Sequence, residues 1–163
     1  KNDMVPIGNP TTPEIVYGFG PSFHYKGFDF SFFFQGVAKT SLFMSGLQPF
    51  GTMMENKNVQ KFIADDRWSP ENQNIFAEYP RLTIERSANN STTSTYWERN
   101  GAFLKLKNAE IGYTFKSMRL YLRGSNLLTF SKFKLWDPEQ GGGNGLKYPT
   151  QRVFNIGFQM TIK

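Results

Sequence analysis

The sequence contains no cysteine and only one histidine, His24. Disulfide bonds and thiolate metal sites are therefore excluded, and the redox state of the compartment is left open. With no second histidine beside it, His24 is expected to be an ordinary polar side chain rather than a metal ligand or an acid–base group. A lone histidine without an acidic partner also forms no nucleophile–base set, so we expect no enzyme, no metal and no cofactor.

Long runs of apolar residues and long runs of basic residues are also missing. No apolar stretch approaches the roughly 18 residues of a transmembrane helix, and the mean hydropathy is −0.48. Alternating strands average to nearly neutral hydropathy, so a transmembrane barrel is not excluded. Lysine and arginine outnumber aspartate and glutamate by 19 to 13, but they are scattered, and we expect no nucleic-acid partner. No signal peptide begins the chain, which for an exported protein predicts a mature form or a piece of a longer one.

Two further kinds of site lack their full patterns. Asp65-Asp66 and the pair Asp137/Glu139 do not have the spacing of a calcium loop, so we expect solvated loop carboxylates. The stretch GGGNG at 141–145 has no Lys-Ser/Thr after it, which favours a flexible surface loop over a phosphate-binding loop.

Aromatic residues, in contrast, make up 17% of the chain, and 17 of its residues are phenylalanine. Residues 28–37 read FDFSFFFQGV, with Phe28, Phe30, Phe32 and Phe34 on every second position. Alternate side chains of a strand point to opposite faces, so this pattern predicts a strand with an all-phenylalanine face. Similar alternation predicts strands at 15–25, 103–115, 118–127 and 152–163.

Two of these strands carry irregularities. Pro21 cannot donate to a strand ladder and weakens the middle of 15–25. In 103–115, Leu104 and Leu106 lie on the opposite parity from the apolar residues that follow, and a bulge near Lys107-Asn108 would restore the register.

The connections alternate between short and long. Lys26-Gly27 and Lys116-Ser117 are of tight-hairpin length, whereas 38–102 and 128–151 are long loops. In an antiparallel meander this places all short turns at one rim and all long loops at the other, the layout of an outer-membrane barrel. Five strands cannot close a barrel, so residues 1–163 are interpreted as one segment of a larger one.

The apolar parity is therefore predicted to face membrane lipid, and the polar parity a wet lumen or a plug. No charged residue occupies the apolar parity of 28–34 or 154–162, where lysine or arginine would cost roughly 2–4 kcal/mol at the midplane. The predicted lipid-facing residues are Phe28, Phe30, Phe32, Phe34, Phe154, Ile156, Phe158, Met160 and Ile162.

Five blocks of sequence, in order, resemble the C-terminal end of a SusC/RagA-type TonB-dependent transporter. They are VPIGNPTTPEIVYGFGPSFHYKGFDFSFFFQG (5–36), RWSPENQNIFAEYPRL (67–82), YWERNGAFLKLKNAEIGYTF (96–115), LYLRGSNLLTFSKFKLWDPE (120–139) and YPTQRVFNIGFQMTI (148–162). Each block is weak alone, but the set covers nearly the whole chain.

The resemblance implies an all-β, antiparallel, up-and-down barrel of 22 strands in the outer membrane of a Gram-negative cell, of which this chain forms the last five. It further implies import of oligosaccharides or peptides with a SusD-like surface lipoprotein as a lid. Energy would come from the TonB complex through an N-terminal region that, like the plug, is absent here. The chain departs from the family where it ends on Ile162-Lys163 instead of an aromatic residue, and in its short link from Phe115 to Met118.

Six aromatic residues lie in or beside the long connections. They are candidates for contact with a sugar or peptide, or with the lid, because their rings offer a large contact area at low entropic cost. An interfacial aromatic girdle and packing within the loops are alternative interpretations. The six are Trp68, Tyr79, Tyr96, Trp97, Trp136 and Tyr148.

Two other hypotheses remain open at this point. The first is a secreted β-sandwich carbohydrate-binding module that uses the loop tryptophans. The second is a basic single-strand nucleic-acid binder of the oligonucleotide-binding type.

Overall fold

The structure is a computed structural model that describes residues 4–44, 59–83 and 87–162. The chain forms two units. We call residues 9–41, 100–141 and 147–163 the sheet unit, and residues 1–8, 42–99 and 142–146 the loop unit. Among the described residues, no helix has both the length and the apolar character needed to cross a membrane.

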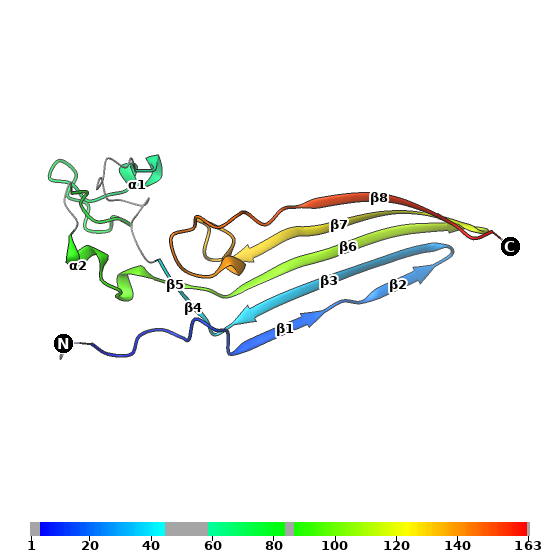
Figure 1. Cartoon of the computed structure of the whole chain (residues 1–163), viewed down its shortest axis with the longest axis horizontal. Helices are drawn as coiled ribbons and strands as arrows, with labels where there is room; N and C mark the ends of the chain where they lie inside the picture. Colours follow the sequence, from blue (N-terminus) through cyan, green and yellow to red (C-terminus); the bar gives the residue numbers. More distant parts are fainter. Residues whose placement is uncertain (1–3, 45–58, 84–86, 163) are drawn as a thin grey trace. The chain divides into compact units, whose positions relative to one another are not determined.

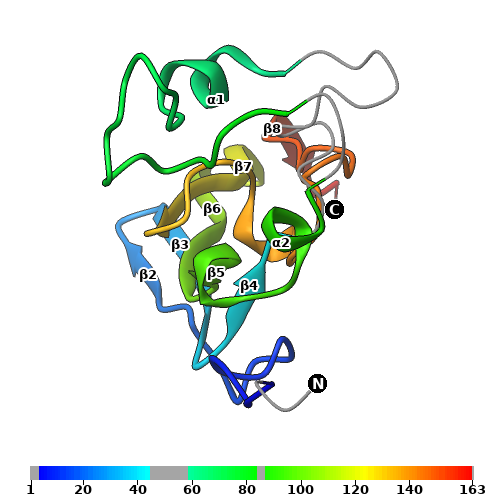
Figure 2. The same cartoon turned by 90° about the vertical axis from the view of Figure 1, so that its left-hand side faces the viewer.

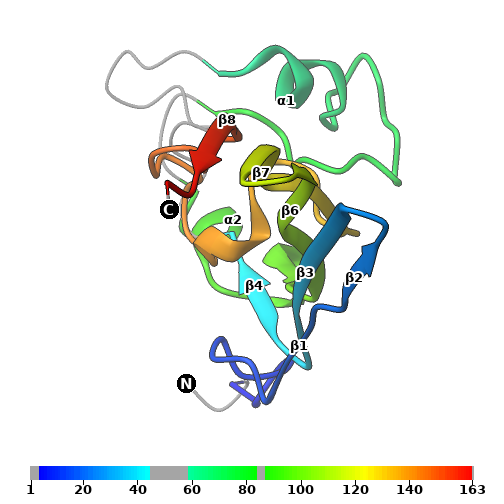
Figure 3. The same ribbon diagram turned by 90° about the vertical axis from the view of Figure 1, so that its right-hand side faces the viewer.

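The sheet unit contains one antiparallel sheet (Figure 1). Both β1 and β2 pair with β3, and the order then continues through β6 and β7 to β8. Figures 2 and 3 view the sheet from its two ends, with β6 and β7 between β3 and β8. The strands are β1 (Ile15–Phe19), β2 (Ser22–Tyr25), β3 (Phe28–Ala38), β6 (Phe103–Phe115), β7 (Met118–Ser131) and β8 (Val153–Met160).

Three strands differ by more than one residue from the ranges that alternation predicts. The strand predicted at 152–163 is β8, which ends at Met160. The segment 15–25 is divided at Gly20-Pro21, because proline has no N–H to give to the ladder. The strand predicted at 118–127 continues to Ser131. Asn126 has a φ of 54°, which interrupts the extended backbone. The alternation begins again at Leu128, but the sequence pattern alone does not show that both parts belong to one strand.

The two short turns lie at the same end of the sheet (Figure 1). Lys26 and Gly27 join β2 to β3 with φ values of 46° and 89°, the positive pair that a tight hairpin uses. Lys116, with a φ of 52°, begins the turn between β6 and β7, which closes directly from Phe115 to its partner Met118. The connections from β3 to β6 and from β7 to β8 leave from the other end.

The predicted bulge is confirmed at Lys107. Phe33 pairs with Asn108 and Phe34 with Leu106, so Lys107 has no partner on β3. Without this extra residue Leu104 and Leu106 would lie on the opposite face from Ile111.

A cross-strand contact on the polar face depends on a glycine. Tyr121 of β7 pairs with Gly157 of β8, and its ring lies where a Cβ at position 157 would stand. The Arg119 guanidinium sits 4.9 Å from the centre of the same ring. Gly157 thus gives the Tyr121 ring room to lie flat along the sheet.

The loop unit has a small core of its own, although the sequence predicted only a loop there. Ile63, Tyr79 and Trp97 are buried together, and Met44 and Leu82 pack against them. Its short elements are α1 (Lys61–Asp65), α2 (Ala88–Ser91), η2 (Thr95–Trp97), and the paired strands β4 (Ser41–Phe43) and β5 (Glu98–Asn100), whose end residues Ser41 and Asn100 belong to the sheet unit.

We predict that Gly157→Val lowers the free energy of unfolding by about 1–3 kcal/mol, because the new side chain overlaps the Tyr121 ring. The measurement is the urea midpoint of the full-length protein. Adding Tyr121→Ala removes the ring and should recover most of the loss. A double variant as unstable as Gly157→Val alone would contradict this contact.

Candidate functional site: two faces of one sheet and an anchored loop

One face of the sheet is apolar from β1 to β8. Phe34 stacks on Phe19 at 5.3 Å between ring centres, and Phe32 lies 5.5 Å from Phe30 and 5.6 Å from Phe34. Phe28 contacts Tyr113 of β6 at 4.5 Å. The rings therefore form a continuous layer across neighbouring strands.

The residues predicted to face lipid lie on this layer, with one exception. Phe32 and Phe34 are half-buried by neighbouring rings, while the others are exposed, Ile156 by 81%. Ile162 is exposed but lies beyond the end of β8 at Met160. So much exposed apolar surface requires a partner, and contact with lipid stays our prediction for it.

The opposite face is polar and carries a group of ion pairs on its central strands. Arg119 of β7 binds Asp29 of β3 through two nitrogens, and its Nη2 lies 2.6 Å from Glu110 Oε1 of β6. Gly112 lies beneath this group, where a Cβ would come within 2.7 Å of both Arg119 and Asp29. The arginine thus crosslinks three strands on a wall suited to water.

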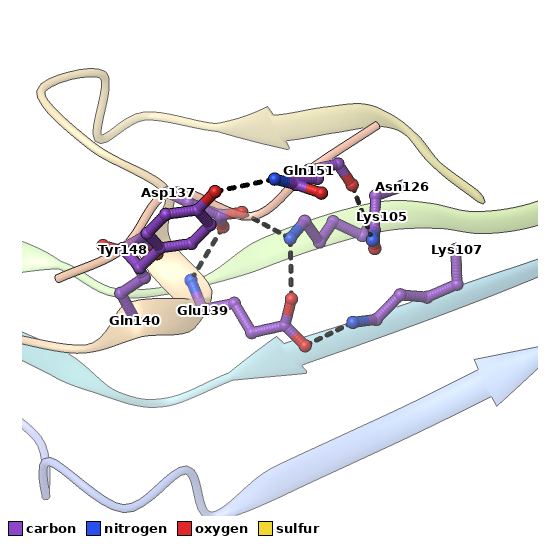
Figure 4. A network of polar contacts seen from close by, with 8 residues as sticks. All are labelled: Lys105, Lys107, Asn126, Asp137, Glu139, Gln140, Tyr148 and Gln151. Atoms are coloured by element: carbon purple, nitrogen blue, oxygen red, sulfur yellow. Dashed lines mark hydrogen bonds and ion pairs between the residues drawn. The ribbon is translucent and has the colours of Figure 1, made fainter. Parts of the chain in front are cut away.

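A second ionic group holds the connection between β7 and β8 to the same polar face (Figure 4). The ammonium of Lys105, a residue only 1% exposed, lies 2.5 Å from Asp137 Oδ2 and 2.6 Å from Glu139 Oε2. Lys107, the bulged residue, binds the other oxygen of Glu139. The carboxylates that we expected to be solvated are therefore paired, because residues 132–141 fold back onto β6.

Local geometry positions the two carboxylates. The Asp137 side chain caps η3 (Pro138–Gln140) by accepting from the Glu139 N–H at 3.1 Å. Gln151 donates to the Tyr148 hydroxyl at 2.8 Å, and Asn126 donates to the Gln151 carbonyl at 3.1 Å (Figure 4). Both ends of the connection are thus tied down next to the ion pairs.

The pairing also changes how the carboxylates titrate. Burial by itself would raise the pKa of Asp137 and of Glu139. The hydrogen bonds and charge of Lys105, together with the Glu139 N–H and Thr150 at Asp137 and with Lys107 at Glu139, jointly outweigh it, and both pKa values lie below their ordinary 3.8 and 4.5. Both groups are therefore ionised throughout the physiological pH range.

The six aromatic candidates separate into buried and exposed residues. Tyr79 and Trp97 belong to the loop-unit core, and Trp68 is half-buried beside Tyr79, whose carbonyl accepts its backbone N–H at 3.0 Å. Tyr96 is 43% exposed, with its ring edge-on to Trp97. Their role in contacting a ligand or a lid stays a prediction, and it now rests on the exposed rings.

The other two candidates lie in the sheet unit. Trp136 is half-buried against Phe133 at 4.6 Å and donates to the Gly141 carbonyl. Tyr148 is 79% exposed. Within the ranges that the structure describes, no three or more His, Asp or Glu side chains gather as a metal site would require.

Known proteins similar in sequence to this chain are TonB-dependent receptors. No family model matches the chain. TonB-dependent receptor P26 of Formosa agariphila is 30% identical over 188 residues, and SusC of Bacteroides thetaiotaomicron is 24% identical over 159 residues. These matches cover 99% and 90% of this chain but only 18% and 15% of the relatives.

Solved structures of the RagAB peptide transporter share the fold. One superposes with a TM-score of 0.74 at 25% identity, covering 94% of this chain and 18% of the solved one. Another, in a closed-closed state, has a TM-score of 0.71 at 23% identity.

The chain belongs to the SusC/RagA-type TonB-dependent transporters. It forms a C-terminal segment of their outer-membrane β-barrel and spans less than a fifth of the length of the relatives it matches. The sandwich hypothesis is not supported, because in the described part of the chain the apolar face is exposed instead of being packed inside. The transporter segment thus presents an exposed apolar layer on one face of its sheet and a polar wall on the other.

We predict that Phe32→Arg impairs assembly of the full-length transporter by about 2–4 kcal/mol, because it places a charge within the apolar layer. Ser31→Arg is the matched control, since Ser31 lies on the polar face opposite Glu110. The measurement is the amount of heat-modifiable barrel in isolated outer membranes. Equal losses from the two variants would show that the faces are assigned wrongly.

We predict that the anchored connection keeps its full stability as the pH falls to the ordinary carboxyl pKa values and loses it only in stronger acid. Since the pKa values of Asp137 and Glu139 are lowered in the folded state, their stabilisation is fully present above the ordinary values. It is lost as pH falls through the folded-state pKa values, which lie below 3.8 for Asp137 and below 4.5 for Glu139. Hydrogen exchange of residues 132–152, corrected for intrinsic rates, should show constant protection from pH 7 to about 5 and a loss below 3.8.

The matched variants for this prediction are Lys105→Met and Lys107→Met. Removing buried Lys105 should lower the stability of the anchored connection by about 3 kcal/mol. This is the low end for a broken buried ion pair, because the two carboxylates are partly exposed. Protection from hydrogen exchange should then be lost already at pH 7. Lys107 contacts Glu139 alone, so its removal should have a small effect. Full protection in Lys105→Met would refute the anchor.

Proposed function

We propose that the transporter containing this segment imports nutrients, oligosaccharides or peptides, across the outer membrane. Energy would come from the TonB complex through the transporter's N-terminal region, and a SusD-like surface lipoprotein would cooperate as a lid. The likeness to a RagAB peptide transporter over 94% of this chain is the observation that supports the proposal. The chain contributes strands to the barrel wall, next to the rest of the barrel and its plug.

The two faces of the sheet suit this role. The exposed aromatic layer is compatible with lipid, and strands of this length, tilted, span the hydrocarbon core. The polar wall, with ion pairs such as those of Arg119 with Asp29 and Glu110, suits the passage of a large hydrophilic solute. No catalytic step is assigned, and imported molecules are expected to cross unchanged.

The experiment is whole-cell uptake of fluorescently labelled oligosaccharide and peptide pools by the native bacterium. We predict that deleting the transporter gene, or collapsing the proton gradient with a protonophore, abolishes uptake of one pool. Uptake that persists in the deletion strain would refute import. Uptake that survives the protonophore would refute energisation through TonB.

The lipoprotein partner has a separate readout. An affinity-tagged transporter, extracted in mild detergent, should bring down a stoichiometric surface lipoprotein encoded beside it. Recovery of the transporter alone, with a known lipoprotein pair as positive control, would refute the pairing.

A further inference from the structure

A small cavity in the loop unit lies beside Tyr96. It encloses about 280 Å³, and its walls come from α2, the residues after α2, η2 and Pro80. Binding pockets for drug-sized molecules have volumes of about 300–1,000 Å³, so this one is suited to a single ring-sized group.

The walls of the cavity are held in place by the loop unit itself. Buried Trp97 donates from Nε1 to the Asn90 carbonyl at 2.8 Å, which fixes α2 against the core. The Tyr96 hydroxyl donates to the Glu78 carbonyl at 2.8 Å, and its ring meets the Trp97 ring edge-on at 4.7 Å. Thr92 Oγ1 donates to the Ala88 carbonyl at 2.8 Å. The pocket is therefore preformed by contacts that a ligand does not have to replace.

The lining carries hydrogen-bonding groups but no charge. Asn89, Asn90, Thr92 and Ser94 supply amides and hydroxyls. Within the described ranges, no hydrogen bond occupies the side chains of Asn89, Asn90 or Ser94. An amide offers two donors and an acceptor, so these side chains can pair with hydroxyl groups of either polarity.

The nearest charged groups neutralise one another. Arg99 Nη2 lies 2.5 Å from Glu78 Oε1, and Arg99 Nη1 also donates to the Tyr96 carbonyl at 2.7 Å. Neither side chain lines the cavity. A ligand with a free carboxylate or ammonium would find no opposite charge in this site, so the free-energy cost of removing its charge from water would not be offset.

We propose that this pocket binds one neutral sugar unit of an oligosaccharide. A pyranose has an apolar C–H face and a rim of hydroxyls, which match the exposed Tyr96 ring and the Asn and Ser side chains respectively. Peptides, in contrast, are commonly held by strand pairing, which this pocket of short helices and turns does not offer. The proposal rests on the import function proposed above and selects oligosaccharide over peptide as the cargo class.

The test is isothermal titration calorimetry on the full-length transporter in detergent. The probes are neutral hexaoses of glucose, mannose, galactose and xylose, with hexa-alanine as the peptide. We expect at least one hexaose to bind, and Tyr96→Ala to weaken it about tenfold through loss of the ring contact. Asn90→Ala, which keeps the carbonyl that Trp97 uses, should weaken it about fivefold through loss of the amide contacts.

Two controls separate ligand contact from damage to the loop unit. Tyr96→Phe keeps the ring and loses only the hydroxyl bound to Glu78, so its affinity should stay within about twofold. Phe76→Ala removes an aromatic ring that is 87% exposed in the same unit but outside the cavity, and it should bind like the wild type.

Each remaining outcome refutes the proposal. These are no binding of any hexaose, equal binding by wild type and Tyr96→Ala, or dependence on Tyr96 for hexa-alanine alone. Uptake assays on the native bacterium, with and without the transporter gene, separate the test of the sugar pocket from the test of the import function. Energised uptake with no hexaose binding would remove the sugar pocket and leave the import function standing. Hexaose binding without energised uptake would remove the import function and leave the sugar pocket standing.

Discussion

Cross-strand hydrogen bonding fixes which side chains of this chain share a face. The ladder from β3 to β8 is regular except around Lys107. One extra residue on β6 changes the parity there relative to β3, and Asn126 and Leu127 of β7 have no partner on β6 at the same level. Leu104 and Leu106 thereby join Ile111 on the apolar layer. Without the bulge, the two leucines would lie on the polar face and Lys105 among the phenylalanine rings. With that layer facing lipid, as we predict, the charge alone would cost roughly 2–4 kcal/mol.

The same bulge explains how the connection between β7 and β8 is anchored. It leaves Lys105 on the polar face and frees Lys107 from pairing, so that the two ammonium groups reach different oxygens of Glu139 (Figure 4). Asp137 completes the group and also caps the turn that carries it. Burying Lys105 would be unfavourable alone, and it is tolerated because two carboxylates surround its ammonium.

Much of the sheet could be predicted from the sequence because alternation is a local signal. Residues 28–37 and the need for a bulge at Lys107 could be read directly from parity. The weak point at Pro21 could also be located, because proline has no N–H for the ladder. The extension past Asn126 could not be placed, since it depends on a backbone conformation that parity does not encode. The pairing of Lys105 with Asp137, 32 residues apart, requires the loop to fold back, so the carboxylates were expected in solvent. For Tyr79 and Trp97, contact with a ligand and packing within the loops both stayed open, because composition does not distinguish a loop with a core from one without.

The contrast between the charged anchor and the neutral pocket follows from what each has to do. A connection that must hold one position gains from buried ion pairs, whose partners are costly to separate. A ligand that must leave again is better held by neutral hydrogen bonds, each of which exchanges with water for a net gain of only about 1 kcal/mol. Asn90 shows both sides of this arrangement. Its carbonyl is committed to buried Trp97, while its side-chain amide stays available in the cavity. A core residue thus keeps the pocket rigid without consuming the groups with which a sugar would pair.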